Sequence, residues 1–204
     1  MFRAAQPRGS TGHRPSKTVF CPGSPVIRRP VKFYWKSSLI GNKETICFEL
    51  GERAIEGSPD LFKFDVWLIG HHITYVDNVA YLKCVVSVIE CDLADEVKLK
   101  RYADYFIGMS PEEAHRFIVS TRDTNSEKYD IEGDEIYPNQ NILNWGPNSD
   151  NVTCFVIPIN GRFVVTLEHH SPLAITGKIF SKEMSLQEFN RTIEAFVEYG
   201  RSKI

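Results

Sequence analysis

The chain has 204 residues, of which 42% are hydrophobic and 25% charged, and its formal net charge at pH 7 is −2. This composition is typical of a globular protein with one substantial core, and it excludes a collagen, a coiled coil and a wholly disordered chain. The longest apolar stretches, such as residues 66–69, fall far short of the roughly 18–20 residues that a membrane span needs. We therefore expect no membrane-spanning segment.

The first 30 residues differ in charge from the rest of the chain. Residues 1–30 hold six basic residues, five prolines and no acidic residue, which predicts a disordered basic tail because little apolar surface is available for burial. Three alternatives stay open: an organellar transit peptide, a nucleic-acid-binding arm, or translation from Val31, which would make residues 1–30 a mis-translated upstream segment. Residues 31–204, with a net charge of −8, are expected to form a single domain.

The cysteines indicate a reducing compartment. There are five, an odd number, and none is spaced as C-x-x-C. Cys47, Cys84 and Cys154 lie in apolar runs typical of strands, where a free thiol behaves as a small hydrophobe. We therefore expect a cytoplasmic protein.

Strand patterns dominate the beginning of the domain. Residues 32–35 and 45–50 are short strand candidates, and residues 61–69 alternate between apolar and polar side chains. Residues 70–78 are predicted to form a turn region. Residues 81–91 are rich in β-branched side chains on both faces, which favours a central strand.

Two helices are expected next. Asp92 is the predicted N-cap of the first, which Gly108 ends, and its apolar positions recur with helical spacing. Ser110, Pro111 and Glu113 predict the start of the second, because serine at the N-cap and glutamate three residues later form a capping box.

A β-hairpin is predicted near the end of the domain. Residues 152–159 and 163–168 flank Asn160-Gly161, a dipeptide that favours the tight turn of a hairpin. The alternation in the second strand predicts that Thr166 faces outward.

The last elements complete the expected fold. Residues 174–180 are a further strand candidate, and Ser185 with Glu188 predicts a C-terminal helix that Gly200 ends. Strands and helices are segregated along the chain, which predicts an α+β fold, with a mostly antiparallel β-sheet and helices packed on one face.

Signatures of catalysis and of metal binding are absent from the sequence. No G-x-G-x-x-G, Walker A or G-x-S-x-G motif occurs. His71-His72 and His169-His170 are conspicuous, but neighbours in an extended chain point to opposite faces, so each pair offers one ligand to a given site.

Two catalytic alternatives each conflict with a local feature of the sequence. Glu90 and Asp92 form a carboxylate pair if the strand continues, but Asp92 is also the predicted helix cap. A cysteine–histidine nucleophile would need an electropositive pocket, whereas the cysteines lie in apolar runs of an acidic domain. We expect no catalytic residue, no metal and no cofactor.

Residues 122–151 form the most informative segment. They hold seven acidic residues against two basic ones, interleaved with aromatic side chains that a solvated linker does not need. Acidic charges steer a basic partner toward a surface, and tyrosine and tryptophan anchor it. The alternative is a solvated acidic loop. The predicted partner-binding residues are Tyr129, Asp130, Glu132, Asp134, Glu135, Tyr137 and Trp145.

Residues 67–82 read W-L-I-G-H-H-I-T-Y-V-D-N-V-A-Y-L. The pattern W-x-x-G-x-x-I-T-x-x-D-N-x-x-Y-L, followed by a closing strand and an amphipathic C-terminal helix, resembles the immunity proteins of bacterial polymorphic-toxin and contact-dependent inhibition systems. The resemblance implies a cytoplasmic protein that binds one cognate toxin domain, in many cases a basic nuclease, and blocks it.

An acidic domain agrees with that implication, because it docks on a basic nuclease and repels nucleic acid itself. The sequence leaves two other classes open. One is a small hydrolase or metal-dependent enzyme that uses His71 or His72 with Glu90 or Asp92, and the other is a structural or phage-type interaction protein. It does not indicate the oligomeric state.

Overall fold

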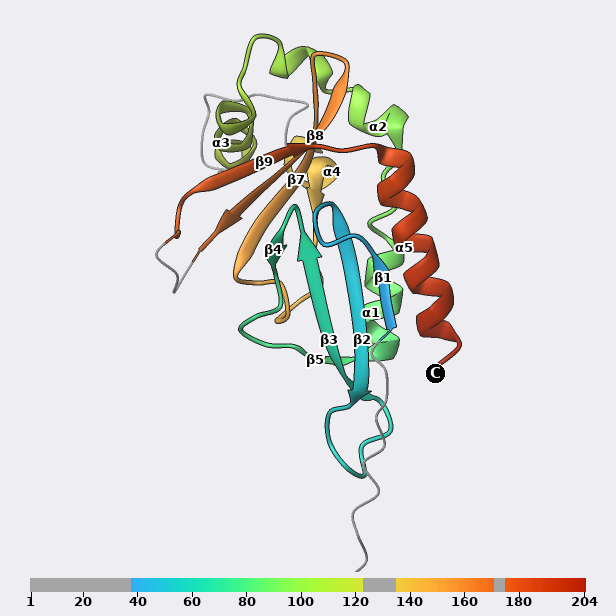
Figure 1. Cartoon of the computed structure of the whole chain (residues 1–204). Helices are drawn as coiled ribbons and strands as arrows, with labels where there is room; N and C mark the ends of the chain where they lie inside the picture. The colour runs from blue at the N-terminus through green and yellow to red at the C-terminus, as the bar shows by residue number, and fades with distance from the viewer. Residues whose placement is uncertain (1–37, 123–134, 171–174) are drawn as a thin grey trace, which may run out of the picture. The chain divides into compact units, whose positions relative to one another are not determined.

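Two antiparallel β-sheets organise the part of the chain that the structure, a computed structural model, describes (Figure 1). The described residues are 38–122, 135–170 and 175–204. The expected strand at 32–35 and the expected basic tail lie outside them.

The first sheet contains β1 to β5. Strand β3 lies inside it and pairs with β2 on one side and with both β4 and β5 on the other. The predicted alternation of β3 is confirmed, because Phe64, Val66 and Leu68 are fully buried while Lys63 is exposed. The strands are β1 (Ser38–Gly41), β2 (Ile46–Arg53), β3 (Leu61–Leu68), β4 (His71–His72) and β5 (Val79–Tyr81).

The prediction of a central strand at residues 81–91 was wrong, because this segment is the helix α1 (Leu82–Glu90). Its buried residues recur at intervals of three, one and three, which is the spacing of one helix face. They are Leu82, Val85, Val86 and Ile89.

Helix α1 packs against α5 (Leu186–Arg201), which runs beside it in Figure 1. The prediction that Gly200 ends α5 was wrong, because Gly200 lies inside the helix, at its contact with α1. A Cβ at Gly200 would lie 2.5 Å from Cγ2 of Val86, so only glycine allows the two helices to approach this closely.

The second sheet contains β6 (Asn141–Ile142), β7 (Val152–Ile159), β8 (Arg162–His169) and β9 (Ile179–Glu183) in that order. The predicted hairpin is confirmed between β7 and β8.

Asn160 and Gly161, which connect β7 and β8, have φ values of 50° and 74°, as a turn with two left-handed residues requires. The expectation that Thr166 faces solvent was wrong. Its side chain is fully buried and bonds His115, because a helix covers that face of β8.

Four further elements follow α1 in the sequence before the second sheet begins: α2 (Glu96–Lys100), a 3-10 turn η1 (Ala103–Phe106), α3 (Pro111–Thr121) and α4 (Ile136–Gln140). The capping box of Ser110 and Glu113 is confirmed. Asp95, rather than Asp92, caps α2, accepting from the backbone N–H groups of Val97 and Lys98.

Two apolar cores result. One lies between the first sheet, α1 and α5 and extends to β7 and β8, and the other lies between β7, η1, α3 and α4. The α+β class and the antiparallel pairing are as predicted, with two sheets in place of one. Within the described ranges no helix is long and apolar enough to cross a membrane.

Candidate partner-binding site

Glu135 is the first residue of the predicted acidic site that the structure describes; Tyr129, Asp130, Glu132 and Asp134 lie outside the described residues. Its carboxylate is exposed and accepts a hydrogen bond from the Tyr102 hydroxyl at 2.9 Å. The Arg101 guanidinium forms an ion pair with the same oxygen at 3.4 Å. Glu135 thus stands at the surface with a fixed position.

Tyr137 lies two residues after Glu135, in the first turn of α4. Its ring is half-buried and meets the Phe155 ring edge-on, with the centroids 5.3 Å apart. The Arg122 guanidinium lies 5.3 Å from the Tyr137 ring centroid. The half-buried ring is therefore held between Phe155 of β7 and the guanidinium of Arg122.

Trp145 is not a surface anchor, contrary to the prediction. Only 5% of it is exposed, and its ring packs against Phe48 and Phe64 of the first sheet. Its indole N–H donates to Oδ2 of Asp92 at 2.6 Å. The aromatic residues of the segment 122–151 predicted that Trp145 anchors a partner, but its ring packs in the hydrophobic core.

A cavity of about 490 Å³ opens where α1, α2 and α4 come together. Tyr137, from the acidic segment, lines it together with Asp92 and Asp95. Burial raises the pKa of Asp92 from its ordinary value of 3.8 to about 6, and the hydrogen bonds from Leu143 and Trp145 oppose this shift. A carboxyl with a raised pKa in a cleft is a common mark of a functional position. We call this cavity the Asp92 pocket.

The other predicted constellations take different forms. Glu90 does not pair with Asp92 but forms a 2.5 Å ion pair with Arg201. Cys84 is exposed on α1 rather than buried in a strand, whereas Cys47 and Cys154 are buried as expected.

The two histidine pairs approach each other across the two sheets. His71 Nδ1 lies 3.3 Å from His169 Nε2, while His72 turns the other way and bonds Asp65 at 2.8 Å. Each pair thus contributes one imidazole to the contact, as the extended geometry predicted. No group of three or more metal-ligating side chains occurs in the described portion of the chain.

The W-x-x-G part of the motif builds the β3–β4 turn. Gly70 has a φ of 86°, a conformation that glycine adopts without strain. Trp67 pairs with His72 across the two strands, and their rings stack with centroids 4.5 Å apart. The ammonium of Lys43 lies 4.1 Å from the Trp67 ring.

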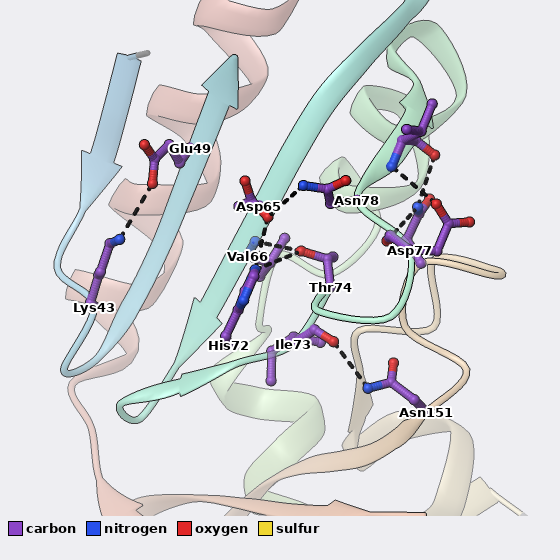
Figure 2. Close-up of polar contacts among 12 residues, drawn as sticks. Lys43, Glu49, Asp65, Val66, His72, Ile73, Thr74, Asp77, Asn78 and Asn151 are labelled. Atoms are coloured by element: carbon purple, nitrogen blue, oxygen red, sulfur yellow. Dashed lines mark hydrogen bonds and ion pairs between the residues drawn. The ribbon is translucent and has the colours of Figure 1, made fainter. Parts of the chain in front are cut away.

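The I-T-x-x-D-N part of the motif stabilises the segment that connects β4 to β5, as Figure 2 shows. The Thr74 hydroxyl accepts from the Val66 backbone N–H at 3.0 Å, in the position a strand partner would take. The Asn78 amide donates to the Asp65 carboxylate, and the Asp77 carboxylate accepts from the Val79 backbone N–H. These positions of the motif therefore have structural roles, while Tyr81 is exposed and the Trp67 indole N–H is buried without a hydrogen-bond partner among the described residues.

Comparison with known proteins gives a likeness of fold. No family model matches the chain, and no curated protein matches it. Among solved structures, the fold is similar to that of CdiI from Burkholderia dolosa AUO158, a contact-dependent inhibition immunity protein, with a TM-score of 0.51 at 13% identity. The likeness covers 79% of this chain and 99% of that chain. It extends over almost the whole of the solved protein.

Proposed function

We propose that the chain is an immunity protein that binds a cognate toxin domain and occludes it, without catalysing a reaction. The observation that carries this proposal is the fold likeness to CdiI, which covers 99% of the CdiI chain. The structural role of residues 67–82 supports it, because the motif that resembles immunity proteins builds part of this fold.

The partner we propose is a basic toxin domain, such as a nuclease. Residues 31–204 carry a net charge of −8, which attracts a basic protein and repels nucleic acid. The acidic residues of the segment 122–151 would steer the toxin, with Tyr137 as an aromatic contact. Asp130 and Glu132 are proposed on sequence alone, while Glu135 stands at the described surface.

Growth protection tests the proposal. The toxin candidate is the C-terminal domain of a large protein encoded next to this chain, expressed from an inducible promoter with and without the chain. We expect protection from that domain and a stoichiometric complex of the purified partners, and neither with a toxin domain from another system. Growth arrest despite the chain, with no complex formed, would show that the proposed function is wrong.

Charge reversal tests the acidic segment. Asp130→Lys with Glu132→Lys should slow association by about tenfold at low salt and flatten its salt dependence, while the melting temperature stays the same. Glu112→Lys with Glu194→Lys is the matched control, because both side chains are exposed and lie on α3 and α5. Equal association rates for the two double variants would move the partner surface elsewhere.

A further inference from the structure

The Asp92 pocket contains two carboxylates that the fold uses only in part. Oδ2 of Asp92 accepts from the Leu143 backbone N–H at 2.7 Å and from the Trp145 indole N–H at 2.6 Å. Oδ1 of Asp95 accepts from the first-turn N–H groups of α2. For the residues that the structure describes, all hydrogen bonds to each carboxylate end on that one oxygen. The second oxygen of each remains available to a ligand.

A cation for these carboxylates is missing from the described residues. Lys98 also lines the pocket, but none of the ion pairs between described residues contains Lys98, Asp92 or Asp95. A half-buried carboxylate without a counter-ion is costly, as the raised pKa of Asp92 shows. A cation supplied from outside would remove that cost.

The walls of the pocket suit the stem of a long basic side chain. Leu93, Leu99 and Ile142 give an apolar lining, and the Tyr137 ring stands beside it. Arginine and lysine bury their methylene stems against apolar surface while the charged head meets polar groups, and a guanidinium also stacks on an aromatic ring. A guanidinium has more donors than one carboxylate can satisfy, and here two carboxylates line one cavity.

We propose that the Asp92 pocket receives one arginine or lysine side chain of a protein partner, with the free oxygens of Asp92 and Asp95 as its counter-charge. The inference rests on the proposed function, since the partner is then the toxin domain. It deepens that function, because it assigns a specificity site on described residues outside the acidic stretch 123–134.

The variant Asp92→Asn separates charge from structure. The asparagine side-chain oxygen accepts the same hydrogen bonds from Leu143 and Trp145, so the fold is kept while the charge is lost. Glu112→Gln is the matched control, because Glu112 loses the same charge on the exposed face of α3. Cooperative melting of Asp92→Asn at a temperature no lower than that of Glu112→Gln would confirm that the pocket remains folded.

The first measurement uses N-acetyl-arginine methylamide as the probe, followed through the indole N–H signal of Trp145 in NMR. We expect millimolar binding to the wild type and to Glu112→Gln, at least about tenfold weaker binding to Asp92→Asn, and none of the uncharged N-acetyl-citrulline methylamide. An indole signal that does not move with the arginine compound, or moves equally with the citrulline compound, would overturn the inference.

The second measurement uses the toxin domain itself. We expect Asp92→Asn to weaken the affinity of the complex by at least about tenfold. We also expect one substitution of an arginine or lysine of the toxin to weaken the affinity for the wild-type chain but to cause no further loss of affinity for Asp92→Asn. If Asp92→Asn binds the toxin domain as tightly as the wild type does, the inference about the Asp92 pocket is wrong, while the proposed function still holds. Absence of any complex with the wild type would instead overturn the proposed function, while the arginine probe still decides the chemistry of the pocket.

Discussion

The turn from β3 to β5 and the Asp92 pocket differ in the partners that surround their polar side chains. In the turn, the side chains of Thr74, Asp77 and Asn78 all bond neighbouring backbone or side-chain groups of the same network (Figure 2). In the pocket, Asp92 accepts hydrogen bonds from Leu143 and Trp145, but no ion pair to it occurs among the described residues, and burial raises its pKa to about 6. The fold therefore destabilises the charged form of this carboxylate.

This difference distinguishes residues that indicate the fold from residues that indicate a binding site. A sequence motif whose side chains bond neighbouring groups of the fold identifies the architecture, and the same architecture supports many functions. A polar group that the fold leaves partly unused at a structural cost is a better indicator of a ligand. Here the recognisable motif lies in the turn, whereas the pocket has no motif.

The largest expected effect is that of Trp145→Ala, because this residue joins the two regions. Its ring packs against the first sheet and its N–H holds Asp92, while Asn148, in the same loop, bonds the Asp77 and Val79 carbonyl groups of the turn. We expect a loss of about 3–5 kcal/mol in the free energy of unfolding, measured in urea. A surface anchor would instead show weaker partner binding with unchanged stability.

Local chemistry made the helix starts and the hairpin predictable. Ser110 with Glu113, and the turn Asn160-Gly161, satisfy requirements set within a few residues, so the sequence contains the whole signal. The alternation of β3 is of the same kind.

The strand prediction at residues 81–91 failed because the deciding information is distant. The run fits a buried strand as well as a helix, and its β-branched residues favour the strand. The helix is favoured by packing against α5, where Gly200 gives Val86 room. That contact joins positions more than a hundred residues apart, and the sequence of the run does not encode it.

Of the residues that line the Asp92 pocket, the sequence indicated Tyr137 as a partner-binding residue. The excess of acidic and aromatic residues indicated the segment 122–151, and Tyr137 from that segment does line the pocket. Asp92 was assigned as a helix cap because its partners are invisible locally: Leu143 and Trp145 lie 51 and 53 positions further along the chain. The sequence shows where a carboxylate lies along the chain, but it does not show whether that carboxylate is buried.

A smaller effect is expected for Thr74→Val, which tests whether the turn is purely structural. Thr74 is fully buried, and valine leaves the buried N–H of Val66 without its acceptor. We expect a loss of about 1–3 kcal/mol in urea unfolding, because an unsatisfied buried donor costs that much. Binding of the arginine compound should stay the same under conditions where the variant is folded; weaker binding would mean that the turn also supports the pocket.

The smallest effect expected is the pH dependence of stability that Asp92 contributes. Its pKa is about 6 in the folded protein against an ordinary value of 3.8, so the folded state binds the proton more tightly than the unfolded state. Stability from this group is therefore present below about pH 4 and is lost as the pH rises to about 6. Asparagine does not titrate, so Asp92→Asn should gain roughly 1–2 kcal/mol over the wild type between those limits.

Urea unfolding of both proteins at several values between about pH 4 and pH 7 measures this difference directly. The variant Glu112→Gln, whose side chain is exposed, should follow the wild type in parallel and shows the contribution of charge alone. If Asp92→Asn also followed the wild type in parallel, the carboxylate would carry no cost in the folded protein, and the argument for a missing cation would lose its energetic support. If the difference appears and vanishes when the toxin domain is bound, the partner supplies that cation, because the ionised carboxylate is then as stable as the amide.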